Sequence, residues 1–287
     1  MEEEEKMKGT FYGWYMKCQS ASQTLAVIPA VHQCGKERTC SIQIITDSDA
    51  WNVPFPDGMY RRQEKNIWIG KNKFGRNGLS LKINKPGLTV NGMLNFGELS
   101  PLRYDIMGPF AIIPFMECRH GVWSMEHTVN GTLRINDQVF RFHNARGYWQ
   151  GDKGHSFPKQ YAWTHCFFNG GSLMLSVADI PFGGLRFTGV ICAIQWLGRE
   201  YRLATYLGAR AVHIHDGEVV IQQGRRQLTV RRLEQKGHPL AAPSRGNMSR
   251  TIHETASCRA YYQLVDGGQT IFAREVENAA FEYEYPV

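Results

Sequence analysis

The sequence predicts an all-β protein, and three observations lead to this fold class. Short apolar runs rich in β-branched and aromatic residues recur along the chain, as in residues 173–178 and 187–196. Turn-forming residues separate these runs at short spacing. No long window keeps the apolar period of an amphipathic helix. Many short strands divided by regular turns are typical of a β-sandwich or a β-barrel.

Turn signals predict where successive strands meet. Asp216 and Gly217 lie between two short apolar runs in residues 211–220, which is a strong signal for a β-hairpin. Similar signals occur at 129–131, 136–137 and 266–268, and a turn at 197–200 leads into a strand at 201–206. Residues 225–232 alternate cations with apolar side chains, as a strand with one solvated face does. Residues 237–250, which include Pro239, Pro243 and Gly246, are predicted to form a long loop.

Length and composition are those of an ordinary globular protein. The 287 residues can bury a full core and are compatible with one domain or two. The seven cysteines are an odd number without Cys-x-x-Cys spacing, which predicts reduced thiols. No apolar stretch long enough to span a membrane occurs, and the acidic start differs from a signal peptide, so we expect a cytoplasmic protein. Residues 1–8 are expected to form a disordered acidic tail.

The net charge of +7 raises the question of an anionic partner. The cations are scattered except for the cluster at 225–232, so we do not expect the protein to bind nucleic acid. A solvated strand face is one explanation of that cluster. The alternative is a peripheral contact with an anionic membrane, to which each cation near the surface contributes about 1 kcal/mol.

Ionisable and aromatic residues are concentrated in two segments, 116–127 and 147–158. An apolar ligand site with a proton-handling group would use these residue types. The glycine-rich start of the second segment also makes it the best candidate for a domain boundary. We therefore expect an N-terminal β domain at 9–146 and a C-terminal β domain at 147–287, with an apolar pocket at or near their junction.

Several sequence blocks follow one another in an order that is typical of a known family, and they cover nearly the whole chain. The blocks are FYGWYMK at 11–17, LAVIP at 25–29, IMGPF at 106–110, PFMECRHG at 114–121, SMEH at 124–127, SFP at 156–158, YAW at 161–163, SLMLSVADIP at 172–181, FTG at 187–189 and YRLATY at 201–206. With these blocks the chain resembles the tocopherol cyclase family, whose relatives include carotenoid 1,2-hydratases and lipocalin-like Diels–Alderases. The resemblance implies two consecutive lipocalin-like β-barrel or sandwich domains with an apolar pocket. It also implies one of the activities known in these families, which are closing a chromanol ring, hydrating carotenoid double bonds and templating a cycloaddition.

One block departs from the pattern of the family. The family usually reads G-Y-x-E-K-D-W-G where this chain has residues 147–154. Gln150 replaces the glutamate, Gly151 the lysine and Lys153 the tryptophan, whereas Asp152 remains. The departure bears on both the substrate and the reaction.

Cyclising or hydrating a prenyl chain by acid catalysis begins with protonation of an unactivated alkene, which requires a strong and dry acid. A carboxyl group desolvated in a β pocket keeps its proton near neutral pH. Asp152 is the first candidate for this acid, and the alternative is an aspartate that bonds to its own turn. Glu117 is the second candidate, and the alternative is a structural pair with Arg119 or Arg103. His120 is the candidate for a nearby proton relay.

Aromatic and histidine side chains near these acids are candidates for lining the substrate pocket. Aromatic faces stabilise a carbocation by about 2 kcal/mol or more when desolvated. For each residue taken alone, ordinary core packing is the alternative. The candidates are Trp14, Tyr15, His127, Tyr148, Trp149, Phe157, Trp163 and His165.

The sequence shows no nucleotide-binding fingerprint, so no cofactor is expected. The spacing of Cys118, His120 and His127 is not typical of zinc, so no metal is expected either. The predicted function is acid-catalysed cyclisation, isomerisation or hydration of a hydrophobic prenylated or polyene substrate. A non-catalytic carrier of a lipid-like molecule and a shape-templating cycloaddition enzyme are the alternatives.

Overall fold

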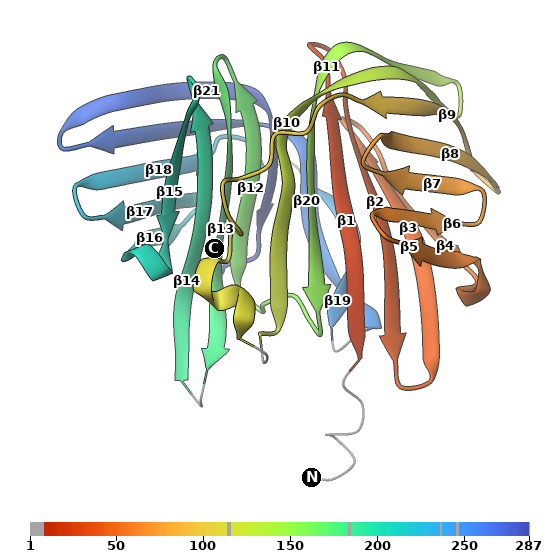
Figure 1. Cartoon of the computed structure of the whole chain (residues 1–287), viewed down its shortest axis with the longest axis horizontal. Helices are drawn as coiled ribbons and strands as arrows, with labels where there is room; N and C mark the ends of the chain where they lie inside the picture. The colour runs from red at the N-terminus through yellow and green to blue at the C-terminus, as the bar shows by residue number, and fades with distance from the viewer. Residues whose placement is uncertain (1–8, 114–115, 183–184, 236, 245–246, 287) are drawn as a thin grey trace. The chain divides into compact units, whose positions relative to one another are not determined.

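The computed structural model of the chain describes residues 9–113, 116–182, 185–235, 237–244 and 247–286. The described residues form 21 strands and three short 3-10 helices, which confirms the all-β fold class (Figure 1). The predicted acidic tail, residues 1–8, lies outside the described residues. No helix in the described part of the chain is long and apolar enough to cross a membrane.

The first sheet has eleven strands in the order β4-β3-β2-β1-β11-β10-β9-β8-β7-β6-β5. Most neighbours in the sheet are also neighbours in the sequence, and β1 pairs with β11 to join the two halves of the order. The bounds are β1 (Thr10–Gln19), β2 (Thr24–Cys34), β3 (Glu37–Thr46), β4 (Ala50–Phe55), β5 (Tyr60–Gln63), β6 (Asn66–Ile69), β7 (Asn72–Gly75), β8 (Gly78–Lys85), β9 (Leu88–Phe96), β10 (Cys118–Ile135) and β11 (Gln138–Gly154).

The second sheet has ten strands, nine of them in the order β15-β14-β13-β12-β21-β20-β18-β17-β16, while β19 pairs with β20. The 3-10 helices are η1 (Asp57–Met59), η2 (Gly108–Ile112) and η3 (Thr205–Leu207). The bounds of the strands are β12 (Tyr161–Phe168), β13 (Gly171–Phe182), β14 (Leu185–Trp196), β15 (Arg199–Ala204), β16 (Arg210–His215), β17 (Glu218–Gln223), β18 (Arg226–Arg232), β19 (His238–Ser244), β20 (Asn247–Asp266) and β21 (Gln269–Tyr283).

The chain divides into two compact units. Unit 1 comprises Met1–Pro101, Val122–Ser156 and Ala241–Arg250, and unit 2 comprises Leu102–Gly121, Phe157–Leu240 and Thr251–Val287. The boundary expected between residues 146 and 147 falls within strand β11.

Each unit has its own hydrophobic core, to which alternate residues of the strands contribute. On β1, Trp14, Met16 and Cys18 belong to the core of unit 1. Tyr15 and Lys17, which alternate with them, are also buried. Both faces of β1 are therefore shielded from solvent, and the second face carries polar groups.

The hairpin predicted at Asp216 and Gly217 is confirmed. These residues join β16 to β17 with φ of +51° and +75°, as a two-residue type I′ turn requires. The seven cysteines all lie in the described part of the chain, and no disulfide joins any of them.

Residues 147–154, the candidate for a domain boundary, form the end of strand β11, so Asp152 lies in a strand and not in a turn. One expectation about a loop is wrong. Residues 237–250, expected to form a long loop, contain strand β19 and the start of β20. Within the described residues β19 pairs with β20 alone, and an edge strand tolerates proline because a proline without an N–H can face away from the neighbour.

Candidate functional site

Strand β11 carries three of the candidate site residues, Tyr148, Trp149 and Asp152, and presents them on two faces of the sheet. Trp149 belongs to the core of unit 1, whereas Tyr148, Gln150 and Asp152 alternate with it. In β1, Tyr15 lies opposite Gln150 across the strand pair. The structure therefore brings Tyr15, Tyr148 and Asp152 to one face of unit 1, and Trp14 and Trp149 to the core.

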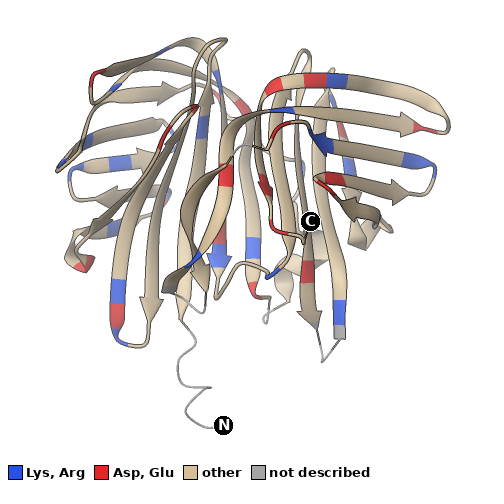
Figure 2. Cartoon of the chain, turned by 180° about the vertical axis from the view of Figure 1, so that it is seen from behind, with Lys and Arg blue, Asp and Glu red and all other residues tan. Residues whose placement is uncertain are grey.

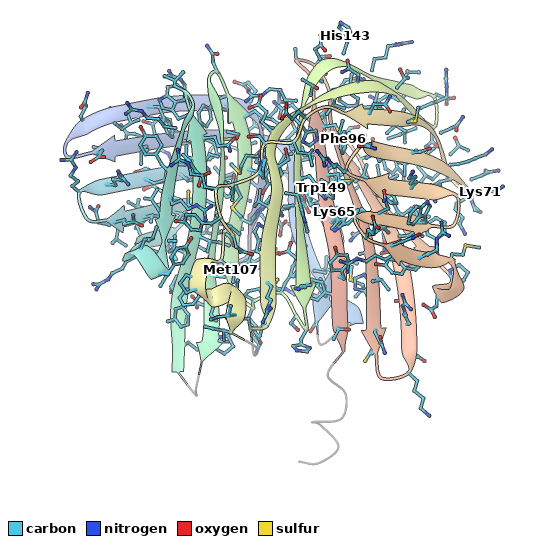
Figure 3. All side chains as sticks on the ribbon, in the orientation of Figure 1. Lys65, Lys71, Phe96, Met107, His143 and Trp149 are labelled. Atoms are coloured by element: carbon cyan, nitrogen blue, oxygen red, sulfur yellow. The ribbon has the colours of Figure 1, made fainter. Side chains whose placement is uncertain are left out.

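Three tryptophans form a cluster on the core side. The Trp149 ring lies 4.9 Å from Trp14 in a T-shaped arrangement and is stacked on Trp123 at 5.3 Å, both measured between ring centroids. The indole N–H of Trp14 donates to the Tyr12 hydroxyl at 2.7 Å. The buried indole N–H of Trp149 has no hydrogen-bond partner among the described residues. Trp149 is labelled in Figure 3.

Trp123 was not among the candidates from the sequence, although it belongs to the segment at 116–127. Its place in the cluster depends on a glycine in the neighbouring strand. A Cβ atom on Gly151 would lie 2.5 Å from the Trp123 ring, so only a glycine leaves room for that ring. The alternation of Trp123 and His127 along β10 is the signal that could have placed both residues on the core face.

His127 lies in the core of unit 1 as a neutral imidazole. Its ring centroid is 4.4 Å from that of Phe96, and its Nδ1 lies 3.0 Å from the Ser124 hydroxyl. Because that hydroxyl donates its hydrogen to the Glu126 carbonyl at 2.8 Å, the proton of the imidazole is assigned to Nδ1. Nε2 is buried and has no hydrogen-bond partner among the described residues. Burial lowers the pKa of His127 to about 4.

The second face of unit 1 carries a row of buried polar groups. The Tyr148 hydroxyl donates to Oε1 of Gln150 at 2.6 Å, and Asp152 follows on the same face of β11. Burial raises the pKa of Tyr148 well above its ordinary value, and the negative charge of Asp152 adds to this effect. Lys17 lies opposite Tyr148 in β1 and is fully buried. We call Tyr148, Gln150 and Asp152 the polar row.

His32 on β2 is a further buried group that sequence reasoning missed. Neither ring nitrogen has a hydrogen-bond partner among the described residues, and burial lowers its pKa to about 4. No motif surrounds His32 in the sequence, so only the fold reveals that it is buried.

The two buried histidines predict that the protein loses stability in mild acid. Their folded pKa of about 4 lies below the ordinary value of 6.5, so the unfolded state binds more protons between these pH values. The stability that the two neutral histidines contribute is complete above about pH 6.5 and is lost as the pH falls toward 4. At pH 5 the free energy of unfolding is lower by about 2 kcal/mol per histidine. Urea unfolding at pH 7.5 and pH 5.0 measures this decrease.

A matched pair of variants tests the assignment to His127. His127→Gln should lose about 2 kcal/mol less than the wild type between the two pH values. His213→Gln, which changes an exposed histidine of β16, should keep the wild-type dependence. An unchanged pH dependence in His127→Gln would show that His127 does not cause the loss.

The other candidates lie in unit 2. Glu117 lies in a bend just before β10, His120 lies in the first residues of β10, and both are half-buried. The Phe157 ring lies 6.0 Å from that of Tyr161. In β12, Trp163 lies opposite Ser176 and Glu282, and His165 packs edge-on against Phe167 at 4.6 Å.

Two buried hydrogen bonds in unit 2 were not foreseen from the sequence. The Tyr161 hydroxyl donates to Oε2 of Glu282 at 2.5 Å. The hydroxyls of Thr164 and Tyr262 lie 2.6 Å apart, and burial raises the pKa of Tyr262 well above its ordinary value. The partners are about a hundred residues apart in the sequence, so no local motif links them. No group of three or more potential metal ligands occurs among the described residues.

Three solved structures share the fold of this chain. A Nitrosomonas europaea protein assigned provisionally as AttH has a TM-score of 0.56 and 8% identity, covering 98% of this chain and 94% of its own. CghA bound to Sch210972 has a TM-score of 0.57 and 10% identity, and the match covers 97% of this chain and 89% of the CghA chain. Kievitone hydratase from Nectria haematococca has a TM-score of 0.53 and 8% identity, and the match covers 96% of this chain and 89% of the hydratase chain.

These identities are low, so the likeness shows the fold alone, and the expected lipocalin-like fold is confirmed. No family model matches the chain, and no curated protein matches it at a significant level. The resemblance to tocopherol cyclases in particular therefore stays a prediction.

Proposed function

We propose that the protein is an enzyme of the hydratase or cyclase type that acts on a hydrophobic prenylated or polyene compound by proton transfer to an alkene. The polar row on β11 is the observation that supports it most. This row places one carboxyl group, Asp152, beside two neutral polar groups on a face that is otherwise shielded from water. Among the structures with this fold, one is a hydratase and another holds a bound small molecule.

Asp152 is the proposed acid because it is the carboxyl group of the polar row. Tyr148 stays a neutral phenol because its pKa is raised, and its proton is shared with Gln150. Lys153 is exposed, and the alternation of β11 points its side chain away from the face of Asp152. This arrangement argues against an ion pair between Lys153 and Asp152.

The remaining candidates have supporting roles in this proposal. Glu117 is the second candidate for the acid and His120 the candidate for a proton relay, and both lie in unit 2. Aromatic side chains would stabilise the cation, and the exclusion of water would decide between a ring and an alcohol as product. The substrate-binding set proposed from the sequence is Trp14, Tyr15, His127, Tyr148, Trp149, Phe157, Trp163 and His165. Of these, Trp14 and Trp149 lie in the core of unit 1, on the face opposite the polar row.

Replacing Asp152 with asparagine should lower turnover by about 100-fold or more, which is the usual contribution of a general acid. The substitution keeps size and hydrogen bonding but removes the acidic proton. The assay incubates the protein with a panel of prenylated quinols, prenylated phenols and carotenoids, and detects products by mass spectrometry. Asp137→Asn, in the exposed turn between β10 and β11, is the matched control and should keep full activity.

Equal turnover by the wild type and Asp152→Asn would remove Asp152 from the mechanism. If Asp152→Asn and Glu117→Gln together keep most of the activity, the pocket would act by shape, as in a cycloaddition template.

A carrier without chemistry is the second candidate, and Gln150 is the observation that favours it. A neutral amide that already accepts a hydrogen bond from Tyr148 stands where the resembling family has a glutamate. Native mass spectrometry of protein purified from cells distinguishes the two. A tightly held and unaltered lipid would support a carrier, whereas turnover of added substrate would support the enzyme.

A further inference from the structure

The strands β5 to β8 carry a charge equal to the net charge of the whole chain. Residues 60–87 contain eight cations and a single carboxylate, Glu64, which gives +7, the same as the chain as a whole. The rest of the protein is therefore neutral overall. The eight cations are all exposed, and we call them the cationic patch: Arg61, Arg62, Lys65, Lys71, Lys73, Arg76, Lys82 and Lys85.

Six of the eight cations lie on the outward face or in the turns of four adjacent strands of unit 1. The other two lie over aromatic rings, Arg62 over Tyr12 and Lys85 over Phe55. Arg61, Trp68, Lys73 and Ser80 are successive cross-strand neighbours on β5, β6, β7 and β8. The residues that alternate with Trp68 on β6, Ile67 and Ile69, enter the core. Lysines and arginines are coloured in Figure 2, and Figure 3 labels Lys65 and Lys71, which lie in the turns at the two ends of β6.

Carboxylates do not neutralise the patch. None of its eight cations forms an ion pair within the described part of the chain. The cluster at 225–232 differs, because Arg225 and Arg226 both pair with Asp266 and Arg231 lies 3.7 Å from Glu218. The uncompensated positive charge of the protein is thus at β5–β8 and not where the sequence suggested.

Trp68 indicates which anionic partner the patch fits. The Arg61 guanidinium lies 4.3 Å from the centroid of the Trp68 ring, and the Lys73 ammonium lies 5.8 Å from it. These cations occupy the ring, so a nucleic-acid base could stack on it only by displacing them. A half-buried tryptophan among basic side chains on a broad sheet face is instead typical of contact with lipid headgroups.

We propose that the cationic patch docks the protein on the surface of an anionic lipid bilayer. Four strands at about 4.8 Å spacing present these cations over a width of about 15 Å, so several headgroups can be contacted at once. The inference does not depend on the proposed reaction, although a bilayer is also where an apolar substrate would dissolve.

The experiment is co-sedimentation of the full chain with vesicles of phosphatidylcholine alone or with about one third phosphatidylserine. The wild type should sediment with the anionic vesicles only, and 1 M salt should release it. The double variant Arg61→Glu with Lys73→Glu should bind at least about tenfold more weakly. The double variant Arg199→Glu with Arg210→Glu makes the same change of charge at exposed sites of unit 2 and should bind like the wild type.

A second variant guards against loss of folding. Lys65→Glu with Lys71→Glu alters only exposed turn residues and should also weaken binding about tenfold. Equal binding to neutral vesicles, or an equal loss in the unit 2 control, would overturn the proposal. It would also be overturned if both patch variants kept vesicle binding but lost binding to a single-stranded oligonucleotide, which would assign the patch to nucleic acid.

Discussion

Replacing Arg202 with methionine is expected to destabilise unit 2 by about 3–5 kcal/mol, because it leaves a buried charge without its partner. The side chains of Arg202 and Glu200 are only 6% and 7% exposed, and they form an ion pair at 3.0 Å. The guanidinium also donates to the carbonyls of Asp105 and Tyr104 at 2.9 and 2.6 Å. Each of these groups would lose a charged donor in an environment from which water is largely excluded. The Glu200 carboxylate would keep only the Arg103 N–H at 3.1 Å, and the Asp105 carbonyl would keep the Gly108 N–H at 3.0 Å.

The substitution should also release the segment that precedes η2. The guanidinium lies 3.8 Å from the centroid of the Tyr104 ring, and the Tyr206 hydroxyl donates to the Ile106 carbonyl at 3.1 Å. Arg202 therefore anchors residues of a connecting segment to strand β15. Hydrogen exchange should show faster exchange of the amides in residues 103–110 in the variant.

Urea unfolding measures the loss, and two further variants define its cause. Arg259→Met breaks an exposed pair with Glu275 in the same unit and should leave the unfolding midpoint unchanged. Adding Glu200→Leu to Arg202→Met should recover part of the stability, because it removes the uncompensated carboxylate. If the double variant were less stable than Arg202→Met, the buried charge would not be the cause.

The sequence predicts strands well where a local pattern determines them. The hairpin at Asp216 and the buried run at 173–178 are both found, since alternation and turn chemistry act over a few residues. The segment with Pro239 and Pro243 was misjudged because prolines are common in loops. Whether a strand lies at the edge of a sheet, where proline is tolerated, depends on pairing that the sequence does not show.

The glycines of β11 show why the candidate site was only partly predictable. Gly147 and Gly151 were taken as signs of a domain boundary. In the folded chain a Cβ on Gly147 would lie 2.3 Å from His127, and one on Gly151 would lie 2.5 Å from Trp123. These glycines leave room for rings of the neighbouring strand. A contact of this kind depends on strand register, so the residue types alone indicate the chemistry but not the face on which it occurs.

Replacing Trp149 with alanine is expected to destabilise unit 1 by about 3–5 kcal/mol, because it empties the centre of the tryptophan cluster. Trp149 is 1% exposed and contacts both Trp14 and Trp123. The strands around it are fixed by backbone pairing, so the space would close only in part. Trp149→Phe keeps one aromatic ring at this position and should lose less stability than Trp149→Ala.

The space left in Trp149→Ala should bind a small aromatic molecule. Indole has the shape of the missing side chain, and a ligand present at 100 times its Kd stabilises the folded state by about 2.7 kcal/mol. Thermal unfolding with and without indole measures this rescue. The wild type and Trp149→Phe serve as controls and should show no increase in Tm. An equal increase in all three proteins would mean that indole binds elsewhere.

The same variants decide whether Trp149 belongs to the substrate site or only to the core. If Trp149 only packs the core, Trp149→Phe should keep the KM of the wild type while its unfolding midpoint falls. If the ring also faces the substrate, KM should rise more than the loss of stability explains, and indole should inhibit the wild type. A raised KM with an unchanged unfolding midpoint would keep Trp149 in the substrate-binding set. An unchanged KM would remove it and leave the polar row on the opposite face of β11 as the place where the substrate is handled.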